Sequence, residues 1–225
     1  MSAHTSPVEK MVYVWEGPLR ISHWINFLCI IILSFTGYYI HNPFISSPTS
    51  TSAYVMGTVR YIHYLTGTIF AISVLLRIFW LLVGNRYSSW KCLKSLNLFN
   101  RNARYVLISY IRYYTFTGKK TPHTLGHNPV ALIAYIIIFV LFVLQVFTGF
   151  ALWAQVNPNG LMYSLTGWIF PLISNQWIRF FHYLVMFLIG GFVINHIYSA
   201  VLFDFKTQSG EISSIFSGWK PKRTD

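Results

Sequence analysis

Four histidines stand in or beside long apolar segments, where an imidazole could bind a metal. His182 and His196 are 14 residues apart within one such segment, and His23 and His63 stand near the starts of two others. A helix has about 3.6 residues per turn and rises about 1.5 Å per residue, so His182 and His196 share a face at levels roughly 21 Å apart. Ligating side chains inside a membrane are costly and usually functional. The four histidines are therefore the first candidates for a site.

The composition indicates which elements must position these histidines. Hydrophobic residues make up 54% of the 225 residues and charged residues only 10%, against about 25% charged in a soluble domain. Four segments have the roughly 20 apolar residues that a spanning helix needs: 21–40, 61–83, 129–154 and 180–203. We expect an all-α membrane protein in which residues 1–225 form a single four-helix transmembrane domain. A soluble enzyme, a disordered chain and a disulfide-rich secreted scaffold are excluded.

The positions of the basic residues predict the orientation. The net charge of +12 would suggest a nucleic-acid partner in a soluble protein, but residues 21–59 and 121–178 contain no charged residue, so no continuous basic face is available. Fourteen of the 17 Lys and Arg residues lie in the N-terminal arm, in the loop 84–126 and in the C-terminal tail. The positive-inside rule places these parts, and both termini, in the cytoplasm, where the basic residues meet anionic lipid headgroups. Residues 97–115 are expected to form a helix at the membrane surface.

This topology sorts the four histidines into two levels. His63 and His182 fall at the outer level, and His23 and His196 fall at the inner level. Two imidazoles at each level suit two bis-histidine haems, whose six-coordinate irons favour electron transfer over oxygen chemistry. Gly37 follows His23 by 14 residues, so it offers a gap for a porphyrin at the outer level. Interhelical hydrogen bonds are the alternative, and a zinc or non-haem iron site would want carboxylates, which the expected helices lack.

Three further residues are candidates near the inner level. Arg77 follows His63 by 14 residues, so it is a candidate partner for a haem propionate; the alternative is an arginine that reaches to the interface. His127 and Asn128 precede the third expected helix on the cytoplasmic side and could hydrogen-bond a quinone carbonyl, with His127 relaying protons. The alternative is an N-cap by Asn128, with Pro129 at the first helical position.

Short motifs along nearly the whole chain carry a family resemblance. They are Arg20-Ile-Ser-His23-Trp24-Ile25 leading to Thr36-Gly37, Arg77-Ile-Phe-Trp80, Gly84-Asn85-Arg86-Tyr87-Ser88, Gly126-His127-Asn128-Pro129, and Arg179-Phe-Phe-His182-Tyr183 followed by Phe192 and His196. Together they resemble the b-type cytochrome subunit of membrane-bound nickel–iron uptake hydrogenases. One departure is Phe187, where that family often has tryptophan.

The resemblance implies a bacterial inner-membrane subunit with two haem b groups. Its partners would be a small hydrogenase subunit with iron–sulfur clusters and a large subunit, both facing the periplasm. Electrons from hydrogen would pass the outer haem, then the inner haem, and reduce menaquinone or ubiquinone. The chain has no nickel ligands and no iron–sulfur cysteine set, so it would carry electrons without a hydrogenase active site of its own. The alternatives are a related cytochrome subunit of a formate dehydrogenase or thiosulfate reductase, and a haem-free anchor or transporter.

Overall fold

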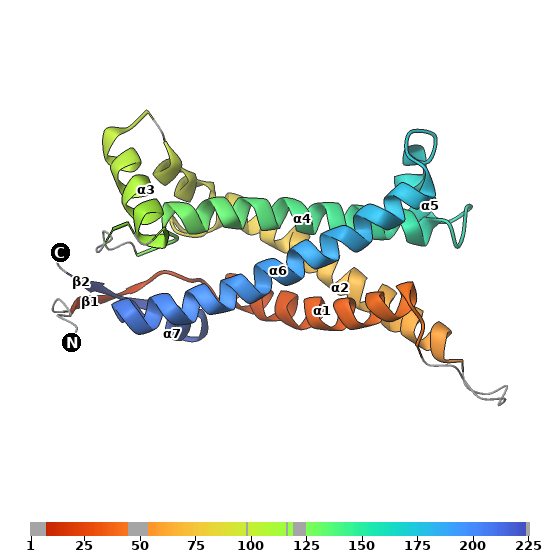
Figure 1. Ribbon diagram of the computed structural model, residues 1–225, viewed down its shortest axis with the longest axis horizontal. Coiled ribbons are helices and arrows are strands. Elements are labelled where there is room, and N and C mark those ends of the chain that lie inside the picture. Colours follow the sequence, from red (N-terminus) through yellow and green to blue (C-terminus); the bar gives the residue numbers. More distant parts are fainter. Residues whose placement is uncertain (1–7, 45–53, 98, 116, 119–124, 224–225) are drawn as a thin grey trace. The chain divides into compact units, whose positions relative to one another are not determined.

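Four long helices dominate the protein (Figure 1). The computed structural model describes residues 8–44, 54–97, 99–115, 117–118 and 125–223. The long helices are α1 (Gly17–His41), α2 (Val55–Val83), α4 (Pro129–Ala154) and α6 (Asn175–Thr207), and each is long and apolar enough to cross a membrane. Many of their large apolar side chains are exposed, as expected of surfaces that face lipid. The four expected helices are therefore confirmed, and each is able to span a membrane.

Three of these helices begin earlier than the sequence predicted. Helix α1 begins at Gly17 instead of residue 21. Helix α2 begins at Val55 instead of residue 61, and α6 begins at Asn175 instead of residue 180 and continues to Thr207. The expected segments were ended at charged residues. A helix can continue past an arginine, because the apolar stem of the side chain covers the helix while its charged head reaches toward water. As a result, Arg60 and Arg179 lie within the first two turns of membrane helices and not in loops.

Shorter helices connect the long ones. The segment between α2 and α4 contains η1 (Trp90–Leu96) and α3 (Arg101–Tyr114). The side chain of Asn100 accepts a hydrogen bond from the Asn102 backbone N–H and so caps α3, as Asn commonly does. This helix falls within the expected range 97–115; its position on a membrane surface stays a prediction. Between α4 and α6 lie α5 (Leu161–Thr166) and η2 (Gly167–Ile169), and α7 (Glu211–Ser217) follows α6.

A short antiparallel sheet corrects the all-α expectation. Strand β1 (Val8–Tyr13) pairs with β2 (Trp219–Arg223), so Tyr13 lies opposite Trp219 and Lys10 opposite Lys222. Figure 1 shows the two strands side by side. The sequence did not indicate β2 because this short strand contains Pro221, and a proline argues against a strand unless the strand lies at an edge. Its partner is also some 200 residues away in the sequence.

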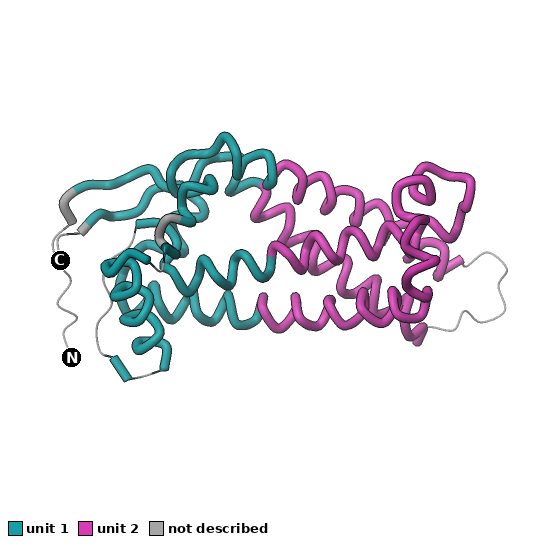
Figure 2. Tube along the Cα trace, turned by 90° about the horizontal axis from the view of Figure 1, so that it is seen from above, with its two compact units in different colours: residues 1–21, 77–138, 194–225 teal, residues 22–76, 139–193 magenta. Residues whose placement is uncertain are grey.

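The contacts group the chain into two compact units (Figure 2). Unit 1 comprises residues 1–21, 77–138 and 194–225, and unit 2 comprises residues 22–76 and 139–193. Each of the four long helices contributes residues to both units. In unit 2, Cys29, Phe70 and Val74 form a buried cluster, against which side chains such as Leu33 and Phe142 pack. This cluster joins α1, α2 and α4.

In unit 1, one carboxylate organises the segments around the start of α1. An oxygen of Glu16 accepts hydrogen bonds from Nε1 of Trp80 (2.9 Å), the backbone N–H of Asn85 (2.8 Å) and Oγ of Ser88 (2.7 Å). Burial acts to raise the pKa of Glu16, but these hydrogen bonds and the charge of Arg77 outweigh it and hold the pKa below its ordinary value. The ionised carboxylate therefore ties the start of α1 to the end of α2.

We expect Glu16→Gln to destabilise the chain. Hydrogen bonds to a charged group contribute about 1.5–3 kcal/mol and neutral ones about 0.5–1.5 kcal/mol, so a loss of roughly 1–2 kcal/mol should lower the melting temperature by roughly 2–8 °C. Because the folded-state pKa is lowered, this stabilisation is fully present above the ordinary pKa of 4.5. It is lost as the pH falls through the folded-state value. Thermal unfolding in detergent at pH 7 and at progressively lower pH would measure both effects; equal melting temperatures at pH 7 would contradict this role.

Candidate functional site

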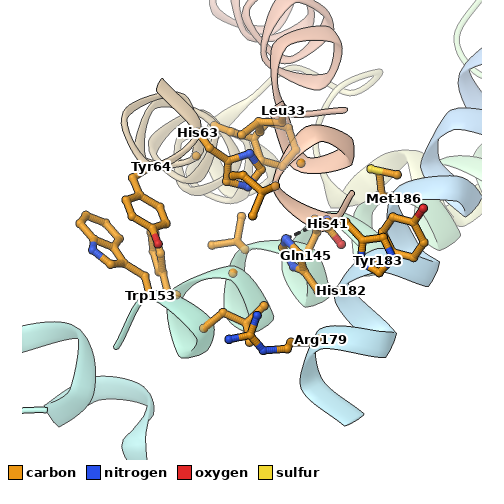
Figure 3. A pocket seen from close by; sticks show the side chains of 18 of the residues that line it. Leu33, His41, His63, Tyr64, Gln145, Trp153, Arg179, His182, Tyr183 and Met186 are labelled. Atoms are coloured by element: carbon orange, nitrogen blue, oxygen red, sulfur yellow. Dashed lines mark hydrogen bonds between the residues drawn. The ribbon is translucent and has the colours of Figure 1, made fainter. Parts of the chain in front are cut away.

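In unit 2, the structure brings His63 of α2 and His182 of α6 together. Their ring centroids are 6.4 Å apart and their planes are inclined by 71°. Both side chains line a cavity of about 500 Å³, which is within the range of roughly 300–1,000 Å³ typical of ligand pockets. Figure 3 shows the two imidazoles pointing into this space. The histidines predicted for the outer level therefore share one cavity.

Aromatic side chains flank the histidines around the cavity. Tyr64 and Trp153 stack with centroids 5.0 Å apart and planes inclined by 7°. On another side, His41, the last residue of α1, stacks on Tyr183 at 3.8 Å. Both pairs line the same cavity and are labelled in Figure 3. Flat apolar walls of this kind suit a large planar ligand.

Each histidine ring is held by a threonine and a glycine from a neighbouring helix. Oγ1 of Thr36 in α1 lies 2.8 Å from Nδ1 of His63. Oγ1 of Thr148 in α4 lies 2.9 Å from Nδ1 of His182. A Cβ added to Gly37 would meet Cε1 of His63 at 3.2 Å, and one added to Gly149 would meet Cε1 of His182 at 3.1 Å. Gly37, expected to make room for a porphyrin, thus lies directly against the His63 ring.

Thr148 and Gly149 were not predicted as site residues, although the chain contains a signal for them. Phe-Thr-Gly occurs at 35–37 and again at 147–149, and Arg-x-x-His-Tyr-Leu occurs at 60–65 and again at 179–184. Each copy of the first motif supplies the threonine and glycine that touch the histidine of the second. The two halves of the site are therefore built from the same residue types in the same order.

Two arginines line this cavity without a carboxylate to neutralise them. Arg60 and Arg179 are part of its wall, and Figure 3 labels Arg179. Residues 22–76 and 139–193, which make up unit 2, contain no Asp or Glu. Neither arginine forms an ion pair with any residue that the structure describes. The cavity is therefore suited to an anionic ligand.

The histidines predicted for the inner level lie in different units. His23 belongs to unit 2, where its ring makes an edge contact with Trp24 at 5.2 Å. His196 belongs to unit 1. Their pairing stays a prediction that rests on helix periodicity.

Arg77 is buried in unit 1, with 7% of its surface exposed. Its Nη2 donates to the backbone carbonyl of Ser88 at 3.0 Å, and its guanidinium lies 5.2 Å from the centre of the Tyr135 ring. Its other terminal nitrogen, Nη1, is buried and has no hydrogen-bond partner among the described residues. A buried donor without a partner is costly, so Arg77 has a group available for an anion. The propionate role remains a prediction.

His127 and Asn128 lie at the start of α4 in unit 1. The His127 ring lies between Trp15, at 4.8 Å, and Tyr135, on which it stacks at 5.5 Å. Burial first, and then the charges of Lys220, Arg77 and His196, lower the pKa of His127 to about 4. His127 is thus neutral at pH 7 and able to act as a hydrogen-bond partner, whereas a proton relay near neutral pH would want a higher pKa.

Asn128 forms the helix cap that was the alternative to a quinone contact. Its Oδ1 accepts from the Ala131 backbone N–H at 2.8 Å, and Pro129 is the first residue of α4. Its NH₂ group donates to Oη of Tyr114 at 3.4 Å. The second hydrogen of that group is therefore the part of Asn128 that could donate to a quinone carbonyl. Quinone binding at His127 and Asn128 stays a prediction.

Comparisons with known proteins identify the family. The family model described as prokaryotic cytochrome b561 matches residues 14–218. The chain belongs to this family. A relative from Cupriavidus necator named "Probable Ni/Fe-hydrogenase B-type cytochrome subunit" is 36% identical over 94% of this chain and 87% of its own. A relative from Escherichia coli K12 named "Probable Ni/Fe-hydrogenase 1 B-type cytochrome subunit" is 34% identical over 92% of this chain and 90% of its own.

Membership of a cytochrome b family implies haem b, and the cavity of unit 2 fits such a group. An imidazole nitrogen binds a metal at about 2.0–2.1 Å, so two imidazoles on opposite sides of one metal have ring centres roughly 6 Å apart. The centroids of His63 and His182 are 6.4 Å apart. Haem also carries two propionates, which Arg60 and Arg179 could neutralise. Ring spacing, size and charge therefore agree with a haem held between α2 and α6.

The close approach of Gly149 to His182 leads to a mutational prediction. We expect Gly149→Val to push the His182 ring out of position, because the added atoms have no space, and to reduce the bound haem by about half. Gly190→Val is the matched control, because a Cβ at Gly190 meets nothing within 4 Å. Pyridine-haemochrome assays of the purified variants would measure the haem per chain. Full haem content in Gly149→Val would show that this contact does not position the ligand.

Proposed function

We propose that this cytochrome is the dihaem membrane subunit of a Ni/Fe hydrogenase and carries electrons from hydrogen oxidation to a membrane quinone. The observation that carries the proposal is the pair His63 and His182, which share a cavity lined by two arginines that form no ion pair within the described part of the chain. The names of the relatives support a Ni/Fe hydrogenase as the enzyme to which the subunit belongs. When bound, haem supplies a reversible one-electron carrier, and two histidine ligands leave its iron no open position for oxygen.

The residues of this chain hold the two proposed carriers. His63 and His182 would ligate the outer haem, with Arg60 and Arg179 neutralising its propionates. His23 and His196 would ligate the inner haem. His182 and His196 are 14 residues apart in α6, so the two haem levels are roughly 21 Å apart along that helix.

The proposed site at which electrons pass to a quinone lies at the start of α4. His127 is neutral at pH 7 and sits between two aromatic rings, so an imidazole N–H is available to a quinone carbonyl. The Asn128 NH₂ group is a second donor, and Arg77 lies beside the same aromatic ring, Tyr135. Menaquinone and ubiquinone both have carbonyls that such donors could bind.

The distribution of charge supports the proposed orientation. Fourteen of the 17 basic residues lie in the two termini and the loop 84–126, and the positive-inside rule supports a cytoplasmic position for these parts in a bacterial inner membrane. His63 and His182 then lie toward the periplasm. We propose that the iron–sulfur small subunit of the hydrogenase docks on that side, with the large subunit bound to it.

The order of the two haems can be tested with one variant for each level. In the whole complex, hydrogen should still reduce the remaining outer haem of His196→Ala but should not reduce the remaining inner haem of His63→Ala. Both variants should lose hydrogen-driven quinone reduction and keep hydrogen oxidation with a soluble dye. Absorption spectra recorded under hydrogen would show which haem is reduced. Rapid reduction of the inner haem in His63→Ala would contradict the proposed order.

A further inference from the structure

The threonines beside the histidines of unit 2 each make three hydrogen-bonding contacts, two to carbonyls of their own helix and one to a histidine. The longer carbonyl contact is 3.3 Å in both cases. Oγ1 of Thr36 lies 2.7 Å from the carbonyl oxygen of Ile32, one turn earlier in α1, and 2.8 Å from Nδ1 of His63. Oγ1 of Thr148 lies 2.7 Å from the carbonyl oxygen of Leu144, one turn earlier in α4, and 2.9 Å from Nδ1 of His182. The arrangement is thus the same on both sides of the cavity.

The direction of these hydrogen bonds follows from the groups involved. A hydroxyl has one hydrogen to donate, and a carbonyl oxygen can only accept. The hydroxyl hydrogen of each threonine is therefore directed to the carbonyl of its own helix. Toward the histidine, the threonine oxygen can then only accept. Nδ1 of His63 and Nδ1 of His182 must therefore carry the hydrogen.

A contact on the other side of His182 leads to the same tautomer. The amide nitrogen of Gln145 lies 3.4 Å from Nε2 of His182, and this contact is drawn as a dashed line in Figure 3. An amide NH₂ group can only donate, so Nε2 is the accepting, unprotonated nitrogen. A neutral imidazole with its hydrogen on Nδ1 has its lone pair on Nε2.

We propose that Thr36 and Thr148 are positioning residues that hold His63 and His182 as Nδ1–H tautomers, so that Nε2 is the nitrogen that binds the outer haem iron. The inference rests on the proposed haem site and adds to it the nitrogen used and the residues that select it. Gly37 and Gly149, each next to one of these threonines, let the imidazoles approach closely enough for the bond.

The same bonds tune the iron. A ligating histidine that donates its other N–H to an acceptor is a stronger electron donor, and loss of such a partner typically lowers metal affinity 10- to 100-fold. A stronger donor favours ferric over ferrous iron. Replacing the threonine by the similarly shaped valine should therefore raise the midpoint potential of the outer haem. A tenfold change in the affinity for ferric haem, with the affinity for ferrous haem unchanged, corresponds to a shift of about 59 mV in the one-electron midpoint potential.

The test compares Thr36→Val and Thr148→Val with Thr36→Ser and Thr148→Ser in the full chain. Thr68→Val is the matched control, because the Thr68 hydroxyl bonds the Tyr64 carbonyl of its own helix. Redox titrations followed by absorption, with low-temperature electron paramagnetic resonance of the ferric haems, are the measurements. We expect both valine variants to raise the potential of the haem that His63→Ala removes and to alter its resonance signal. The serine variants and Thr68→Val should behave as wild type.

Each outcome has a defined meaning. Wild-type potentials and signals in both valine variants would overturn the inference. Loss of the outer haem from a valine variant but not from the matching serine variant supports it, since the remaining haem shows that the chain is folded. Loss from both would show that any change of shape at the threonine empties the site, and it would overturn the specific role of the hydroxyl. If His63→Ala removes no haem from the wild-type background, the proposed function fails instead.

Discussion

The site depends on holding imidazoles in an apolar bundle, where hydrogen-bond partners must come from the protein itself. Hydrocarbon offers no hydrogen-bond partner to a ring nitrogen, and an unsatisfied polar group in hydrocarbon costs several kcal/mol. The protein meets this constraint with threonines that are themselves bonded to their helix backbones, as Thr36 and Thr148 are. The second ring nitrogen of each histidine, Nε2, is then the one that keeps its lone pair and can bind a ligand. Each threonine can reach its histidine only where the two helices lie close together, and Gly37 and Gly149 leave room for the histidine rings.

In unit 1, charged side chains are the hydrogen-bond partners of buried and half-buried polar groups. Glu16 is the hydrogen-bond acceptor for the end of α2 and the following turn, and Arg77 donates to the Ser88 backbone of that turn. The sheet of β1 and β2 brings the two ends of the chain together beside these residues. Lys220, fully buried in β2, pairs with Glu211 of α7. The charge of Lys220 also helps to lower the pKa of His127.

The sequence predicted those features that depend on local pattern. Apolar length identified four helices, and the spacing of His63, His182 and His196 along helices assigned them to levels, because helix rise and periodicity are constant. Thr148 was missed because its partner, His182, lies 34 residues later on another helix, and helix rotation is not readable from one segment. The Glu16 network and the sheet were missed for the same reason: their partners are 64 to about 200 residues apart. For Thr148, the repeated Phe-Thr-Gly motif is the signal in the sequence that could have identified the residue.

The central claim is that the chain holds two haems on two histidine pairs. The most direct test is a reduced-minus-oxidised absorption spectrum of the purified full chain, combined with a count of haem per polypeptide and electron paramagnetic resonance of the oxidised form. The account predicts two haem b groups per chain, both low-spin, because each iron would have two nitrogen ligands. One haem per chain would contradict the inner pair, and a high-spin signal or no haem would contradict the account as a whole.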